Sequence, residues 1–77
     1  MDNNDVTWTW EHRAKGERMC GERSDQVYSA AIHIGAFGAW IWDVYKNIKG
    51  YPTFVQGGTS STEENAKTDV ESYARLG

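Results

Sequence analysis

Residues 39–46 read Ala-Trp-Ile-Trp-Asp-Val-Tyr-Lys, and this stretch decides the fold class. Trp40, Trp42 and Val44 occupy alternate positions, so their side chains would share one face of a β-strand. The residues between them would point to the other face. β-Branched and aromatic residues at a period of two predict a strand with one buried face.

The same period of two recurs in two earlier segments. Residues 6–12 place Val6, Trp8 and Trp10 on one face, which predicts a first strand. Residues 27–34 alternate as well and predict a second strand. This segment is rich in alanine, so it is also compatible with a helix.

Turn and capping residues mark the last strand and the helix. A short strand is expected over residues 52–56, with Gly57-Gly58 ending it. A helix is expected over residues 62–76, with Ser61 as its N-cap and Glu64 as the capping-box partner three residues later. The apolar stripe of this helix consists of Ala66, Val70, Tyr73 and Ala74.

These elements predict an α+β fold, an antiparallel sheet of three to four strands with one C-terminal helix packed across one face. At this length the chain is expected to form a single domain, residues 1–77. We expect residues 1–5 to be flexible, and residues 13–25 to form a charged loop or the extension of a hairpin. Because one helix covers one face, the other face of the sheet is expected to stay uncovered.

Composition narrows the classes of function. The net charge of −3 argues against a nucleic-acid-binding protein, which normally carries a basic surface. The longest apolar run, residues 32–42, is about half the length of a membrane span, so no membrane partner is expected. The single cysteine, Cys20, cannot form an internal disulfide and indicates a reducing, cytoplasmic setting.

Side chains suited to metal binding or nucleophilic catalysis are few. Cys20, His12 and His33 lack the close, paired spacing of zinc ligands. A catalytic Cys–His pair would also need an orienting residue and an oxyanion site, and neither has a motif in the sequence. We therefore expect no metal, no cofactor and no enzymatic activity, and assign no catalytic residue.

The aromatic residues point to a partner. Four tryptophans in two Trp-x-Trp pairs would build the core against the helix. They exceed what one short helix can cover, so we also expect some aromatic surface to remain exposed for a partner. The helix adds an acidic face. The expected partner-binding residues are Glu63, Glu64, Asp69, Glu71, Trp40, Trp42 and Tyr45.

Over residues 40–74, the order Trp-x-Trp-x-Val, Phe-Val, Gly-Gly and Ser-x-x-Glu-x-x-Ala resembles small ββα proteins of phages and bacteria. Compact acidic chains in that group include anti-CRISPR and other counter-defence inhibitors, which cover nucleic-acid-binding surfaces with carboxylates. The resemblance implies a non-catalytic inhibitor, encoded by a phage or mobile element, that blocks a basic surface of a host nucleoprotein in the host cytoplasm. Residues 54–74 also resemble the end of a double-stranded-RNA-binding domain, but Glu63 and Glu64 stand where that family has lysines.

Two other functions stay open at this point. A structural homodimer would form if the uncovered sheet face, or an edge strand, paired with a second copy. A small nucleic-acid-binding domain would use the arginines of residues 13–23 together with the tryptophans.

Overall fold

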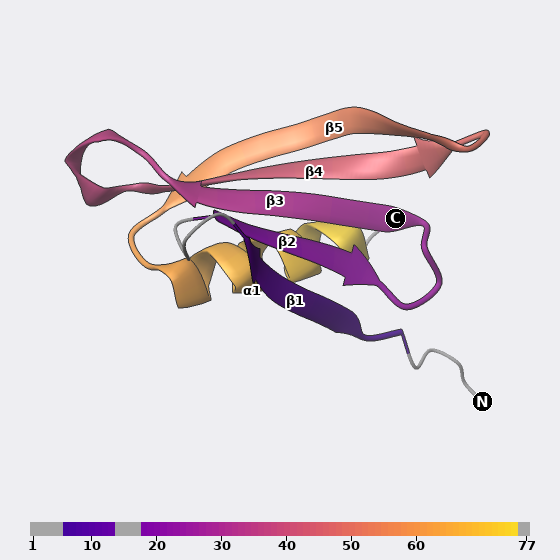
Figure 1. Ribbon diagram of the computed structural model, residues 1–77, viewed down its shortest axis with the longest axis horizontal. Helices are drawn as coiled ribbons and strands as arrows, with labels where there is room; N and C mark the ends of the chain where they lie inside the picture. Colours follow the sequence, from indigo (N-terminus) through magenta and orange to yellow (C-terminus); the bar gives the residue numbers. More distant parts are fainter. Residues whose placement is uncertain (1–5, 14–17, 76–77) are drawn as a thin grey trace.

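The computed structural model describes residues 6–13 and 18–75, so the expected flexibility of residues 1–5 lies outside the described residues. The described residues form the strands and helix β1 (Trp8–Arg13), β2 (Arg18–Arg23), β3 (Tyr28–Ile34), β4 (Trp40–Ile48), β5 (Tyr51–Ser60) and α1 (Glu63–Arg75), with a 3-10 turn, Ala36–Gly38, between β3 and β4. The strands make one antiparallel sheet in the order β1-β2-β3-β4-β5, and α1 lies across one of its faces (Figure 1).

The α+β class, the antiparallel sheet and the C-terminal helix are confirmed, but the described sheet has five strands where three to four were expected. The additional strand, β2, lies within residues 13–25, of which residues 14–17 are outside the described part of the chain. Its pairing with β1 runs from Trp8 opposite Arg23 to Arg13 opposite Arg18. The apolar signal of β2 is weak because Arg23 and Gly21 take inward positions.

Two inward-facing glycines make room for two tryptophans. Trp10 lies directly opposite Gly21, and Trp42 lies directly opposite Gly58. A Cβ on Gly21 would stand 2.5 Å from Cε3 of Trp10, and one on Gly58 would stand 2.8 Å from Cε2 of Trp42. Because glycine has no side chain, each indole lies against the backbone of the neighbouring strand.

The same packing explains why β5 is longer than expected. The prediction that Gly57-Gly58 end the strand is wrong, because β5 continues to Ser60. Gly58 belongs inside the ladder, where it faces Trp42. A shift of register between Val44 and Tyr45 marks a β-bulge, which bends this long hairpin.

The other boundaries follow from local chemistry. Residues 28–34 form a strand, so the helical alternative for the alanine-rich segment is not observed. β4 continues to Ile48, past the expected end at residue 46. A two-residue turn joins β4 to β5, in which Lys49 has φ 53° and Gly50 has φ 87°. Positive φ at both central residues is typical of the type I′ turn that matches the twist of a hairpin.

Helix α1 agrees with the expected range to within one residue, but its cap differs. The hydroxyl of Thr62 accepts a hydrogen bond from the backbone N–H of Asn65 at 3.0 Å, so Thr62 is the N-cap and Ser61 is not. The expected capping box of Ser61 with Glu64 was placed one residue too early. Within the described residues, no helix is long and apolar enough to cross a membrane.

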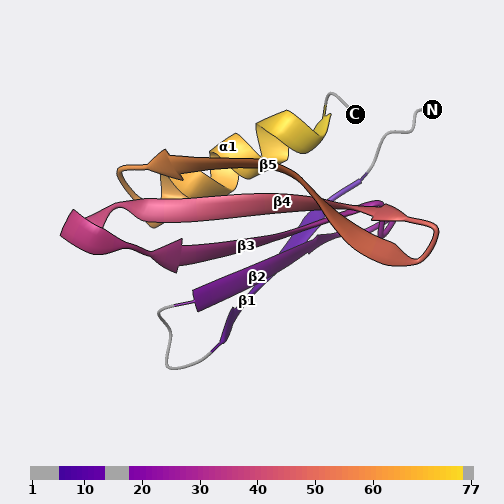
Figure 2. The same cartoon turned by 90° about the horizontal axis from the view of Figure 1, so that it is seen from above.

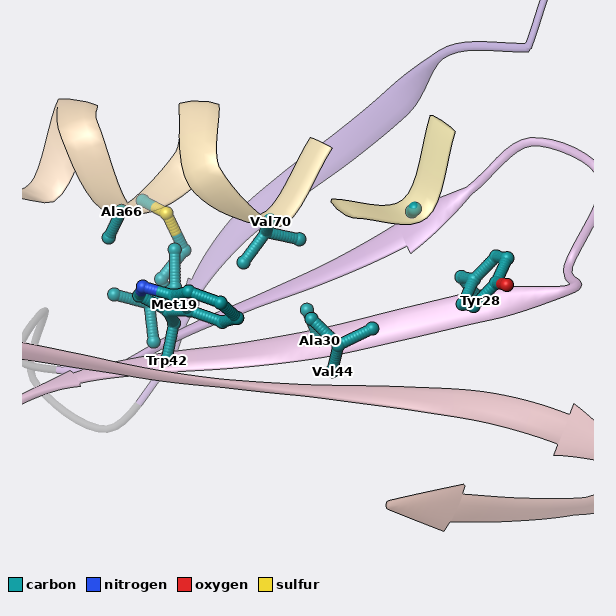
Figure 3. Close-up of a cluster of buried hydrophobic side chains, with 9 residues drawn as sticks. Met19, Tyr28, Ala30, Trp42, Val44, Ala66 and Val70 are labelled. Atoms are coloured by element: carbon teal, nitrogen blue, oxygen red, sulfur yellow. The ribbon is translucent and has the colours of Figure 1, made fainter. Parts of the chain in front are cut away.

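The hydrophobic core lies between α1 and the sheet face beneath it (Figures 2 and 3). The helix contributes Ala66, Val70 and Ala74, all fully buried. Two of these three are alanines, which lets the helix lie close to the large side chains of the sheet. The sheet contributes Met19, Tyr28, Ala30, Ile32, Trp42 and Val44.

Arg23 holds the C-terminal end of α1 to the sheet. Its Nη1 donates to the carbonyl oxygen of Ala74 at 2.8 Å, and its Nε and Nη2 donate to the carboxylate of Asp25 at 2.9 and 2.7 Å. The guanidinium also lies 4.8 Å from the ring centroid of Tyr28. A cation at this position complements the negative end of the helix dipole. The hydrogen bonds from Arg23 hold the pKa of Asp25 below its ordinary value, against a smaller, opposing effect of burial.

Candidate partner-binding surface

Most of the acidic residues of α1 are engaged with the sheet. The carboxylate of Glu71 accepts a hydrogen bond from Nε1 of Trp10 at 2.9 Å, which ties α1 to β1. The carboxylate of Asp69 accepts a hydrogen bond from the hydroxyl of Ser60, which ties α1 to β5. These two acids therefore serve the contact between helix and sheet.

The first turn of α1 holds the other two acids. Glu63 is half-buried, with Oε2 at 3.3 Å from Nε2 of His12 on β1. Glu64 is exposed, and no described residue forms an ion pair with it. Of the four acids expected to face a partner, Glu64 alone is exposed without such a contact.

The tryptophans expected as anchors lie on the helix side of the sheet. Trp42 is 8% exposed beneath α1, so the expectation that it offers a contact surface is wrong. Trp40 is half-buried and packs against the same core. Trp8 and Trp10 stack on each other with ring centroids 5.4 Å apart. The helix and the inward glycines together accommodate more indole surface than the helix alone could cover.

Tyr45, the remaining expected anchor, lies on the opposite side of the sheet. We call that side, turned away from α1, the open face; no described helix or strand crosses it (Figure 2). The register places two rows of residues side by side across it. One row is Glu11, Cys20, Ala31, Asp43 and Gly57, and the other is Thr9, Glu22, Ser29, Tyr45 and Phe54.

A groove of about 470 Å³ is hollowed into the open face. The small side chains of Cys20, Ser29 and Ala31 line it from the central strands, so they form its floor. Tyr45 and Pro52 line it from β4 and β5. On the opposite side the groove is lined by Thr9, Glu11, Arg13 and Glu22.

The β4–β5 hairpin carries exposed apolar side chains on both of its faces. Phe54 is 56% exposed and packs edge-on against Tyr45, with ring centroids 6.0 Å apart. Near the tip, Tyr51 is 74% exposed and Ile48 is 45% exposed, and the register places this pair on the other face of the hairpin, away from the groove. At the other end of the sheet, Phe37 has a fully exposed side chain and a left-handed backbone with φ 61°.

Sequence reasoning placed Tyr45 on this side of the sheet but missed the floor of the groove. In the sequence, the floor is marked only by two small residues at alternate positions, Ser29 and Ala31, on the face opposite the core. A hollow forms because taller side chains of other strands stand beside these residues. Which side chains stand there depends on the strand register, and β2 was not expected as a separate strand.

The open face also carries groups that could bind a metal ion or react. The described residues contain no cluster of three or more His, Cys, Asp or Glu side chains that could hold a metal ion. Cys20 is a free thiol on the groove floor. His33 lies on the same face, and among the described residues its buried Nδ1 has no hydrogen-bond partner. The groove thus combines an aromatic wall, small apolar side chains and charged groups.

Comparisons of the chain with protein-family models, with curated proteins and with solved structures find no match.

Proposed function

We propose that the protein is a non-catalytic protein-binding module that holds its partner on the open face. The observation that carries this proposal is the groove of about 470 Å³, continuous with the exposed aromatic side chain of Phe54, on a sheet face that no described element covers. Contiguous exposed apolar and aromatic surface is typical of partner-binding sites. Tyr45 and Phe54 supply the rigid aromatic area that dominates many protein interfaces.

The finer form of the proposal is an inhibitor that blocks a basic surface of a host nucleoprotein. Carboxylates on the open face support it, because Glu11 and Glu22 line the groove. Asp43 lies in the same row as Glu11, three strands away. Opposite charge on the two surfaces would speed their encounter more than it would tighten the complex. Its encoding by a phage or mobile element remains a hypothesis based on the resemblance described above.

A matched pair of substitutions tests which face binds. Ser29→Arg fills the groove floor, whereas Ser72→Arg makes the same change of size and charge at an exposed position of α1. We expect wild type and Ser72→Arg to capture the same protein from a bacterial lysate, and Ser29→Arg to lose it while keeping its circular dichroism spectrum. If all three chains capture the same protein, the open face is not the binding surface.

For the inhibitor form, the captured protein is tested for nucleic-acid binding in the presence of increasing amounts of wild type or of Ser29→Arg. We expect the wild-type chain alone to displace the nucleic acid. Capture without displacement would leave a binding module that does not inhibit.

A homodimer is the second candidate, and strand β5 favours it. This ten-residue strand lies at the edge of the sheet and contains no charged side chain, whereas the other edge strand, β1, carries Glu11 and Arg13. Charged residues on edges normally prevent pairing between molecules. Light scattering after size exclusion tests it: a monomeric wild type excludes the homodimer, and a dimer that Thr59→Lys converts to a monomer supports pairing through β5.

A further inference from the structure

The central row of the open face has a distinct order across β1 to β4. The register places Glu11 opposite Cys20, Cys20 opposite Ala31, and Ala31 opposite Asp43. Two small side chains are therefore flanked by a carboxylate on either side. Glu22, two residues along β2 from Cys20, adds a third carboxylate at the groove.

The middle of this row suits an aliphatic side chain. Ala31 is 9% exposed and Cys20 is half-buried, so both form a closed, largely apolar floor. Tyr45 and Pro52 stand beside them as an apolar wall. An inserted aliphatic side chain would remove apolar surface from water on both molecules, which is the main source of favourable free energy in such contacts.

The flanks of the row suit cations. Glu11 has one ion pair among the described residues, with Arg13 at 3.5 Å, and both side chains are more than 60% exposed. Such an exposed pair contributes little and exchanges readily. Asp43 is half-buried, and no described residue forms an ion pair with it. A lysine or arginine near Asp43 would therefore gain an acceptor that the chain itself leaves available.

The spacing of the flanks matches an extended chain. Glu11 and Asp43 are three strands apart, which is about 14 Å at ~4.8 Å per strand. An extended segment advances by about 3.4 Å per residue, so it covers nearly the same distance in four residues. Its side chains at the first, third and fifth positions point to the same side.

We propose that the groove binds an extended segment of a partner protein in which an aliphatic residue lies two positions from a lysine or arginine on each side. The segment crosses the strands, with its aliphatic side chain on Cys20 and Ala31 and its cationic ends near Glu11 and Asp43. This proposal rests on the proposed function, and it adds the chemistry of the partner.

Selection from a phage-displayed library of random peptides tests the pattern. The target is the full chain, and the Ser29→Arg and Ser72→Arg variants are used in parallel. We expect basic-x-aliphatic-x-basic peptides to be enriched on wild type and on Ser72→Arg, and to be absent from the Ser29→Arg selection. Enrichment of peptides without basic residues, or no enrichment at all, overturns the proposal.

Nuclear magnetic resonance then locates the selected peptide. We expect the amide signals of Cys20, Ala31 and Asp43 to shift on titration, while those of Ala66 and Val70 in α1 stay in place. The Glu11→Gln and Asp43→Asn variants should each weaken binding by about threefold, as expected for losing one exposed ion pair. Shifts confined to α1, or unchanged affinity in both variants, overturn the assignment.

Lysate capture and peptide selection together distinguish failure of the peptide pattern from failure of the proposed function. If lysate capture depends on Ser29 but the selected peptides carry no basic pattern, the groove binds a partner of other chemistry. If lysate capture does not depend on Ser29, the groove is not the binding surface, and both proposals fail.

Discussion

Individual positions on the helix side of the sheet show how four tryptophans fit into so small a protein. Trp10 and Trp42 each lie over a glycine of the adjacent strand, Gly21 and Gly58. The indole of Trp42 is almost fully buried, and the indole N–H of Trp10 donates a hydrogen bond to Glu71. The glycines are therefore part of the core even though they contribute no side chain to it.

Gly58→Ala should destabilise the fold. The new methyl group would meet the ring of Trp42, which would have to leave its position, and overpacking of this kind lowers the free energy of unfolding by about 1–3 kcal/mol. Urea denaturation followed by tryptophan fluorescence measures the loss. Gly57→Ala is the control, because its Cβ would meet side-chain atoms of Asp43 and Phe54 at 3.2 and 3.3 Å, which can move. Equal losses in the two variants would contradict this account.

Asp25 should make stability depend on acidic pH. Its pKa is held below the ordinary value of 3.8 by hydrogen bonds from Arg23. A carboxyl with a lowered folded-state pKa stabilises the fold above its unfolded-state pKa, and this stabilisation is lost as the pH falls through the folded-state value. Asp25→Asn should therefore be less stable than wild type near neutral pH, and the difference should shrink below about pH 4.

Urea denaturation of both proteins at a series of pH values provides the measurement. A difference in stability that stays constant from neutral to acidic pH would show that the ionised carboxylate of Asp25 does not stabilise the fold.

At the level of whole elements, the cap of α1 offers a direct comparison of two neighbouring hydroxyls. Thr62→Ala should lower the free energy of unfolding by about 1 kcal/mol, because it removes the acceptor for the N–H of Asn65. Ser61→Ala should have a much smaller effect, since its hydroxyl accepts only a long bond from the side chain of Asn65, at 3.4 Å. Thermal unfolding of the two variants checks the difference, and the reverse order would place the cap at Ser61.

The elements differ in how far the sequence could predict them. Strands β1, β3 and β4 and helix α1 were predictable because an apolar residue marks nearly every inward position. β2 was not identified as a separate strand, because Gly21 and Arg23 are inward residues that a hydrophobicity pattern does not detect. β5 was predicted too short because Gly57-Gly58 are typical of a turn, whereas the place of Gly58 inside the sheet depends on Trp42 in the neighbouring strand.

The candidate site was harder to predict than the fold because it depends on contacts between different elements, which a local sequence pattern does not show. The acids of α1 are polar and lie on a helix, so the sequence suggested solvent exposure. Glu71 instead finds a donor in Trp10, which is distant in sequence, and Asp69 finds one in Ser60 at the end of β5. The groove likewise depends on residues from all five strands, and no single segment carries its pattern.

At the scale of the whole molecule, the two sides of the sheet depend on α1 to different degrees. The helix covers Met19, Ile32, Trp42 and Val44, whereas the open face is built without it. A chain that ends at Ser60 should therefore expose a large apolar surface. We expect the truncated chain to bind a hydrophobic dye and to form larger assemblies, which light scattering would detect. The full chain should bind less dye and assemble less. A truncated chain that stays monomeric and binds no dye would contradict this division of roles.

Every strand of the sheet pairs with the strand next to it in sequence, so the ladder consists of short-range hairpins. Proteins in which contacting residues are close in sequence form their structure quickly, because little loop entropy is lost before contacts are made. The helix is the last of these elements along the chain, so the tryptophan-bearing side of the sheet stays unprotected until α1 has been synthesised. Docking of this short, capped helix would end the period in which the nascent chain exposes that apolar surface.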